Sequence, residues 1–343
     1  FSLEGFAFFT EAIFLGIFLY GWKRIPPLAH WFAGVMVAFS GILSGIFVVT
    51  ANAWMNAPTG FDFADGQFFN IDPIAAMFNR ASLHQTLHMT LAAFVATGFG
   101  VAGIHAWLLL RHPHSEFHRR ALKIGALLGC VSIPLQIASG DLAARRVAEL
   151  QPAKLAAMEA HYHTRTHAPF VIGGIPDDTT QTTRYGVEIP GALSLLIGHS
   201  LDTEVPGLDQ IPRDEWPNVR LVHWSFDLMI ACGLAMLALA AWSAWNAWRR
   251  RPLADARRLL RAFVLATPLG FIAIEAGWMV TELGRQPWIV YGYMRTKDAV
   301  TDMPHLAVPF FTIAFVYLLL TVVVIVLMRR QFLDTAPAVP PQR

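Results

Sequence analysis

Seven apolar stretches of about 20 residues divide this chain, and they constrain its fold more than any other feature. Each is long enough to cross the roughly 30 Å hydrocarbon core of a bilayer as an α-helix. They cover approximately residues 3–21, 31–52, 85–109, 121–140, 221–247, 262–282 and 305–328. Charged residues make up 15% of the chain, against about a quarter in soluble proteins. We therefore predict an all-α, polytopic membrane bundle with seven transmembrane helices in this chain.

Basic residues predict how this bundle is oriented. They concentrate in alternate connections, namely Lys23 with Arg24 and the segments 111–123, 249–261 and 329–330. The intervening connection 53–83 carries a single basic residue, Arg80. Because short cytoplasmic loops are enriched in Lys and Arg, we expect the basic connections and the C-terminus to face the cytoplasm.

The connection at 141–220 is much longer than the others and is predicted to lie on the outer side. Long connections without regular structure are usually functional. This one contains a helix-like stretch, PAKLAAMEAHYH, and turn-rich sequences such as GGIPDD. We therefore divide the chain into four transmembrane helices at 1–140, an outer loop at 141–220, three helices at 221–330 and a disordered cytoplasmic tail at 331–343.

Several classes of protein and site receive no support from the sequence. It has no nucleic-acid-binding motif, no phosphate-binding glycine loop and no obvious internal repeat, which weakens a secondary-transporter interpretation. Its two cysteines, Cys130 and Cys232, lie within apolar stretches. We interpret them as packing residues that form no disulfide.

Ionisable residues inside the first stretch are candidates for function, because a charge in a membrane helix costs on the order of 3 kcal/mol or more. Glu4 and Glu11 are seven residues apart and therefore share a helix face. Ser44 and Asn52 are about two turns apart on the next helix. These four side chains could relay protons. The alternative for Glu4 is a solvated position at the helix end.

A histidine and a methionine are candidate haem ligands. His84 and His88 are one turn apart in the third stretch, and Met229 lies in the fifth. By their distance from the outer helix ends, His88 and Met229 fall in the same half of the membrane, where they could bind a low-spin haem. The alternatives are an interfacial histidine, which we prefer for His84, and a packing methionine. Packing does not explain Asp227, two residues before Met229.

The sequence TELGRQPWIVYGY at 281–293 retains charge where the sixth stretch ends. Glu275 and Glu282 share a helix face, and Arg285 follows three residues after Glu282. One interpretation is a Glu282–Arg285 ion pair at the membrane interface, flanked by Trp278 and Trp288 as part of a tryptophan belt.

Several motifs, in order along the chain, resemble subunit I of cytochrome bd-type quinol oxidases. GRQPW, preceded by EAGWMVTEL, resembles the signature of that family. EGFAFFTEAIFLGIFLYGW resembles its third helix, and TANAWMNAPTGF the end of its fourth. LHMTLAAFVATGF resembles the segment that carries the low-spin haem b histidine, and FDLMIACG the segment with the axial methionine. PAKLAAMEA, GIPD and SLDTEVPGL resemble its quinol-binding loop.

The resemblance assigns roles to residues that the spacing leaves open. It implies that His88 and Met229 bind a low-spin haem b, that Glu282 binds a high-spin haem b, and that Trp278 and Arg285 accompany the haems. It places a proton route toward the oxygen site at Glu4, Glu11, Ser44 and Asn52. Asp202 and Asp209 fall in the quinol loop.

Three departures from the family pattern limit this transfer. Family members have two further helices upstream, the first with the histidine expected to bind haem d, and this sequence begins without Met after that point. Asp227 stands where several relatives have an arginine, and Asp209 where some have a lysine. The loop is also short compared with that of some relatives.

The implied function is that of a haem-containing subunit of a respiratory terminal oxidase in the bacterial cytoplasmic (inner) membrane. Quinol would be oxidised at the outer loop, and O2 would be reduced to water with cytoplasmic protons, which separates charge across the membrane. The implied partners are lipid, a second large membrane subunit and a small single-helix subunit. Two alternatives are a haem-b electron-transfer subunit without oxygen chemistry and a proton-coupled transporter without haem.

Overall fold

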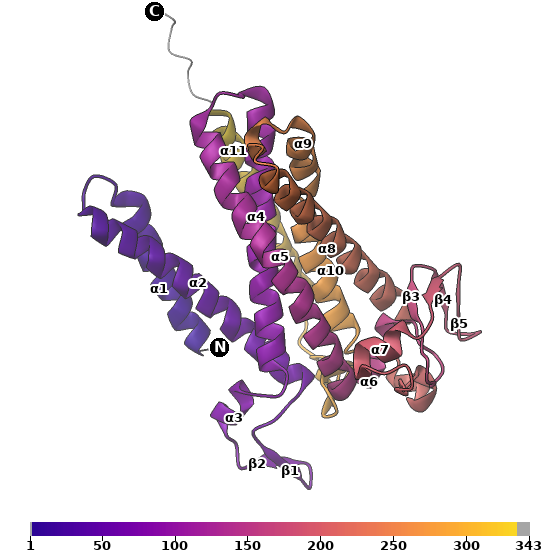
Figure 1. The fold of residues 1–343 in the computed structure, drawn as a ribbon. Coiled ribbons are helices and arrows are strands. Elements are labelled where there is room, and N and C mark those ends of the chain that lie inside the picture. Colours follow the sequence, from indigo (N-terminus) through magenta and orange to yellow (C-terminus); the bar gives the residue numbers. More distant parts are fainter. Residues whose placement is uncertain (1, 335–343) are drawn as a thin grey trace, which may run out of the picture.

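The computed structural model describes residues 2–334, and the predicted all-α membrane bundle is confirmed in this range. Seven spans are long and apolar enough to cross a membrane. They are α1 (Ser2–Tyr20), α2 (Pro27–Asn56), α4 (Ser82–Arg111), α5 (Glu116–Leu150), α8 (Val219–Trp248), the pair α9 (Arg257–Ala266) and α10 (Leu269–Leu283), and α11 (Ala307–Asp334) (Figure 1).

Helix extents differ from the predicted ones at three places. The fourth span continues to Leu150, ten residues into the segment assigned to the outer loop. The sixth is interrupted at Pro268, because proline has no N–H to continue the helical hydrogen bonds. The last helix extends to Asp334, and the remainder of the predicted disordered tail, 335–343, lies outside the described residues.

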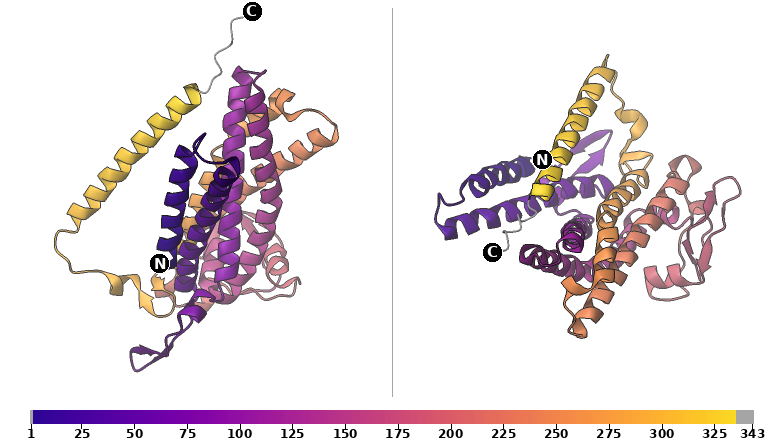
Figure 2. Two further views of the ribbon diagram at one scale, coloured as in Figure 1. Left: turned by 90° about the vertical axis from the view of Figure 1, so that its left-hand side faces the viewer. Right: turned by 90° about the horizontal axis from the view of Figure 1, so that it is seen from above.

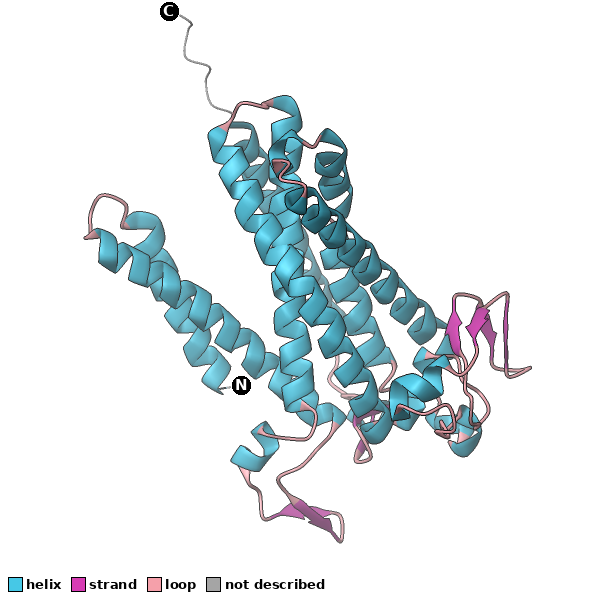
Figure 3. Ribbon diagram, viewed as in Figure 1, coloured by secondary structure: helices cyan, strands magenta, loops and turns pink. Residues whose placement is uncertain are grey.

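With one exception, the short elements gather at one end of the long helices (Figure 3), and the C-terminal end of α11 lies at the other (Figure 2). The short helices are α3 (Pro73–Met77), α6 (Pro152–Met158), α7 (Ala192–Gly198) and the 3-10 turns at 208–210, 213–215, 253–255 and 296–299. Four antiparallel two-stranded ladders pair β1 (Asp62–Ala64) with β2 (Gln67–Phe69), β3 (Phe170–Ile172) with β6 (Val187–Ile189), β4 (Ile175–Asp177) with β5 (Thr182–Arg184), and β7 (Trp288–Val290) with β8 (Met294–Arg295). Of the 3-10 turns, only 253–255, between α8 and α9, belongs to a connection on the other side.

The long helices form a central bundle with two outlying parts. Helices α4, α5, α8, α9 and α10 pack together, whereas the α1–α2 pair leans away and contacts the bundle through α2 and α4. Helix α11 stands apart (Figure 2). None of the residues in its apolar span is buried by the rest of the described chain. Lipid or another protein surface must therefore surround α11 in the membrane.

Helices α4 and α5 approach so closely that glycines are required between them. A Cβ added at Gly98 would lie 2.6 Å from the Cα of Gly129 and 3.0 Å from the carbonyl oxygen of Gly125. Small residues permit such backbone approach between membrane helices. Next to this contact, Phe99 stacks on Phe263 of α9 with ring centroids 6.0 Å apart, in the centre of the apolar core.

We expect Gly98→Ala to destabilise the protein, because rigid backbone faces the new methyl group and the two helices must separate. Overpacking of this kind costs about 1–3 kcal/mol. Gly45→Ala, on α2, is the matched control, because a Cβ there has nothing within 4 Å. The thermal midpoint of the purified protein should be lower for Gly98→Ala than for the native protein and unchanged for Gly45→Ala. Equal midpoints would contradict the close approach.

Candidate functional site

The two candidate axial ligands, His88 and Met229, come from α4 and α8, which both pack against α5 and α10. They follow the starts of their helices, Ser82 and Val219, by six and ten residues. At 1.5 Å per residue they lie roughly 9 and 15 Å from the end that carries the loops. Both side chains are half-buried. The structure thus brings them to the same half of the bundle.

Hydrogen bonds define which nitrogen of His88 can bind a metal. Its Nδ1 lies 3.0 Å from the hydroxyl of Ser139 on α5, and that hydroxyl donates to the carbonyl oxygen of Gln136 at 2.8 Å. Because the single hydroxyl proton is used there, Nδ1 of His88 must be the donor. Its Nε2 therefore presents a lone pair, which is the form that coordinates iron. The side-chain amide of Gln136 lies 3.1 Å from this Nε2 and would have to turn away for Nε2 to bind iron.

Two glycines give the candidate ligands their room. A Cβ added at Gly140 of α5 would lie 3.5 Å from the His88 ring, and one at Gly277 of α10 would lie 3.2 Å from the Met229 sulfur. The sulfur therefore rests against the α10 backbone, one residue from the half-buried Trp278. With a neutral Nε2 on α4 and a thioether on α8, the residues present fit a low-spin haem.

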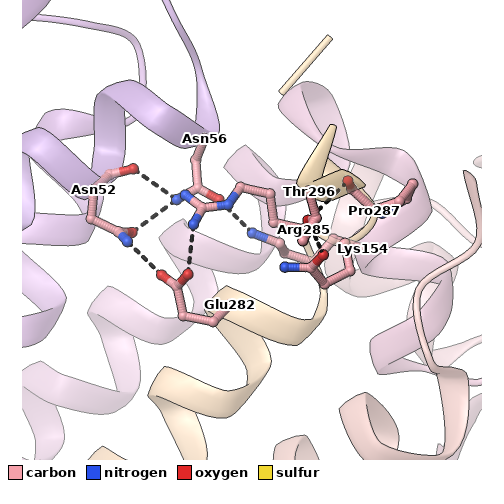
Figure 4. A network of polar contacts seen from close by, with 8 residues as sticks. Asn52, Asn56, Lys154, Glu282, Arg285, Pro287 and Thr296 are labelled. Carbon is pink, nitrogen blue, oxygen red and sulfur yellow. Dashed lines mark hydrogen bonds and ion pairs between the residues drawn. The ribbon is translucent and has the colours of Figure 1, made fainter. Parts of the chain in front are cut away.

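Glu282 is the centre of a polar network that connects three parts of the chain (Figure 4). One of its carboxylate oxygens accepts from the amide of Asn52 on α2 at 2.5 Å, and the other accepts from Arg285 Nη2 at 2.5 Å. The Asn56 amide donates to Asn52 at 2.9 Å, and Lys154 Nζ donates to Asn56 at 2.7 Å. The network thus runs from the end of α10, across α2, to α6 in the long loop.

The ion pair between Glu282 and Arg285 is present, but the two groups are buried unequally. The Arg285 side chain is 3% exposed and the Glu282 side chain 41%. The Nε and Nη1 atoms of Arg285 are buried without a hydrogen-bond partner among the described residues. An accessible carboxylate with unpartnered guanidinium donors beside it fits a haem, whose iron binds an oxygen ligand and whose carboxylates accept from arginine.

The proposed relay residues of α1 and α2 are only partly connected. The Glu11 carboxylate packs on α2, where a Cβ added at Gly41 would lie 3.5 Å from its Oε2, one turn from Ser44. Asn52 joins Glu282 directly. Glu4 is half-buried and makes no side-chain hydrogen bond or ion pair within residues 2–334.

The two loop aspartates differ in their surroundings. Asp209 accepts from the backbone N–H of Thr164 at 3.0 Å and from its hydroxyl at 2.7 Å. Burial opposes its ionisation, but these hydrogen bonds outweigh burial and hold the pKa of Asp209 below its usual value. Asp202 is exposed, and the Nε2 atom of His167 lies 3.7 Å from its Oδ1. Asp209 therefore joins two parts of the long loop, whereas the Asp202 side chain faces solvent.

The chain matches, over residues 1–335, the family described as "Cytochrome bd terminal oxidase subunit I". It belongs to this family. It is 34% identical over 329 residues to the "Putative cytochrome bd menaquinol oxidase subunit I" of Bacillus subtilis (strain 168), which covers 95% of this chain and 74% of the relative. It is 28% identical over 361 residues to the "Cytochrome bd-II ubiquinol oxidase subunit 1" of Escherichia coli (strain K12), covering 85% and 70%.

A solved structure agrees with the fold over almost all of the chain. "The structure of bd oxidase from Geobacillus thermodenitrificans" superposes with a TM-score of 0.89 at 36% identity, covering 98% of this chain and 77% of the other. Membership in the cytochrome bd family makes this chain an integral membrane, haem-binding subunit of a multi-subunit bacterial respiratory oxidase. It decides against the transporter and the electron-transfer alternatives.

Sequence reasoning missed two buried ionisable residues, Lys154 in α6 and Glu159 directly after it. Burial, and next the charge of Arg285, lowers the pKa of Lys154 to about 7, although Glu282 opposes this. Both carboxyl oxygens of Glu159 are buried without a hydrogen-bond partner, and burial, followed by the nearby Asp227, raises its pKa well above the usual value. The sequence PAKLAAMEA does mark these two residues, because a lysine and a glutamate interrupt an otherwise alanine-rich, apolar stretch.

We expect Lys154 to give the protein a pH-dependent stability. Between about pH 7 and the pKa of a free lysine, near 10.4, the unfolded chain holds a proton on Lys154 that the folded chain does not. Stability from this group therefore rises with pH across that window and is lost as pH falls toward 7. The thermal midpoint of Lys154→Met should rise less between pH 7 and 9.5 than that of the native protein.

The exposed Lys297 provides the control for this experiment, because Lys297→Met removes the same group from solvent-facing chain. The thermal midpoint of Lys297→Met should change with pH in the same way as that of the native protein. A native slope in Lys154→Met would show that Lys154 keeps its proton in the folded protein throughout this pH range.

Proposed function

We propose that this chain oxidises quinol at its long loop on the outer side of the membrane and passes the electrons to haems that reduce O2 to water. The observation that carries the proposal is the network from Lys154 through Asn56 and Asn52 to Glu282. It joins the loop to the carboxylate best suited to hold a haem, as a quinol oxidase requires. The relatives described as menaquinol and ubiquinol oxidase subunits support the same reaction.

In this proposal two sets of residues hold haem groups of different spin state. His88 Nε2 and Met229 Sδ would hold a low-spin haem b, and the Glu282 carboxylate would hold a high-spin haem b. Haem d completes the set, and the haems supply the one-electron chemistry and the oxygen-binding iron. Ser139 keeps His88 in its coordinating tautomer, while Arg285 offsets the Glu282 charge and Trp278 packs beside the haems.

Protons for water formation enter through α1 and α2. Glu11 and Ser44 lie near the middle of their helices, whereas Glu4 and Asn52 lie toward the outer ends. A proton delivered to Glu11 can move outward along these groups toward the side chains around Glu282. The basic connections and the C-terminus face the cytoplasm and the loop faces outward, so quinol protons are released on the opposite side and charge separation needs no pump.

The loop supplies the quinol site, and it contains two kinds of polar group for the task. Lys154 in α6 and Glu159 directly after it are buried ionisable groups, and Asp202 is an exposed carboxylate that quinol can meet first. A second large membrane subunit and a small single-helix subunit complete the oxidase, with lipid and those subunits covering surfaces such as α11.

Replacement of Met229 by leucine tests the low-spin site. Met229→Leu removes the thioether but nearly conserves volume, so the cost in folding should be less than about 1.5 kcal/mol. The reduced low-spin b band of the purified oxidase should weaken or shift, and quinol oxidation should fall. Met236→Leu, buried in the core on the same helix, is the control and should leave both unchanged. A native spectrum in Met229→Leu would return Met229 to a packing role.

Replacement of Glu282 by alanine tests the high-spin site. Glu282→Ala should remove the high-spin haem b signal and retain the low-spin signal, because His88 and Met229 lie on other helices. Glu275→Ala removes an exposed carboxylate on the same helix face and should retain all haem signals. If Glu282 served only as the ion-pair partner of Arg285, full haem content would persist in Glu282→Ala.

A further inference from the structure

Asp227, which packing alone does not explain, is paired with a histidine one turn earlier on α8. His223 Nε2 lies 3.3 Å from Asp227 Oδ2, and the His223 side chain is 0% exposed. A buried imidazole and a half-buried carboxylate on one face of a helix require polar partners, because unpaired polar groups are costly to bury. Those partners come from the long loop.

Hydrogen-bond acceptors surround the His223 ring. Its Nδ1 lies 2.7 Å from the carbonyl oxygen of Met158, at the end of α6, and its Nε2 lies 3.0 Å from the carbonyl oxygen of Gly173, between β3 and β4. A neutral imidazole can donate from only one nitrogen, whereas an imidazolium donates from both. Both nitrogens of His223 thus face carbonyl oxygens of the long loop, and the Asp227 carboxylate lies beside Nε2.

The same stretch of α8 holds the β3–β4 turn at three further points. The Gly173 N–H donates to Asp227 Oδ2 at 2.8 Å, and the indole N–H of Trp224 donates to the carbonyl oxygen of Gly174 at 2.8 Å. Arg220 Nη2 reaches the carbonyl oxygen of Pro176 at 3.4 Å. Gly174 has φ +93°, and a Cβ there would lie 2.7 Å from Thr183, so this turn accepts only glycine.

We propose that His223 and Asp227 are positioning residues that fix the long loop on α8, close to Met229, so that quinol docks within electron-transfer reach of the low-spin haem. The inference rests on the proposed function, since it assumes that the loop binds quinol. His223 joins two loop segments, the end of α6 and the β3–β4 turn. Asp227 lies two residues before Met229, so the loop and the candidate ligand share one short segment of helix.

The test is His223→Gln in the complete oxidase, because the glutamine side chain can reach only one of the two loop carbonyl oxygens that the imidazole ring bridges. We expect three measurements to respond differently: the haem spectrum, the KM for quinol and the rate of trypsin cleavage. The dithionite-reduced haem spectrum should stay native, since dithionite does not need the loop. KM for quinol should rise about tenfold with kcat little changed, because the docking-competent loop placement is populated less. Trypsin should cleave faster after the exposed Arg184 of β5.

Two other variants keep the test independent of folding. Asp227→Asn preserves an acceptor for Gly173 and similar size, and it should move KM and cleavage in the same direction by less. His118→Gln makes the same substitution at another fully buried histidine, near the far end of α5, and should leave all three quantities native.

Each outcome decides a different part of the inference. Native KM and native cleavage in His223→Gln would overturn the anchoring role, and loss of the low-spin band would assign His223 to the haem site instead. Faster cleavage with an unchanged quinol KM would support the anchor but overturn the loop as the quinol site, and with it that part of the proposed function.

Discussion

The Glu282 carboxylate is the group on which the arrangement of this protein depends. It ends α10, accepts from Asn52 of α2 and pairs with Arg285, and through Asn56 it reaches Lys154 of the loop. In a membrane protein such a group cannot rely on water, so its partners must come from other helices. The α1–α2 pair, which otherwise leans away from the bundle, is thereby attached to the region of the candidate haem ligands.

A second polar centre organises the other side of the loop. His223 and Asp227 connect α8 to the end of α6 and to the β3–β4 turn. With Lys154 bound to α2 through Asn56, α6 is held at both ends, one facing Glu282 and the other facing the Met229 helix. A loop that must deliver electrons benefits from such fixed placement, because electron transfer and docking both depend on distance. The contacts of Lys154 with α2 and of His223 and Asp227 with the loop explain why the connection between α5 and α8 is well packed.

Much of the fold could be predicted because its signal is local. Seven apolar stretches specify seven membrane spans, and the spacing of Glu4 and Glu11 specifies a shared face. Helix ends were less predictable: α5 continues to Leu150 because its last turns pack on α6 and α7, which the hydropathy of 141–150 does not reveal. The short strands of the loop also have weak local signals, since each is only two or three residues long.

The sequence by itself determined the membrane class, the order of the helices, the family and the identity of the candidate ligands His88, Met229 and Glu282. Tertiary packing alone set which nitrogen of His88 carries the proton, that Asn52 and Arg285 share Glu282, and that Lys154, Glu159 and His223 are buried. The physical reason is that hydropathy and helical period are properties of one segment. A hydrogen bond between residues 52 and 282, or the contacts of the residue 223 ring with the carbonyl oxygens of residues 158 and 173, exist only after distant segments have packed together.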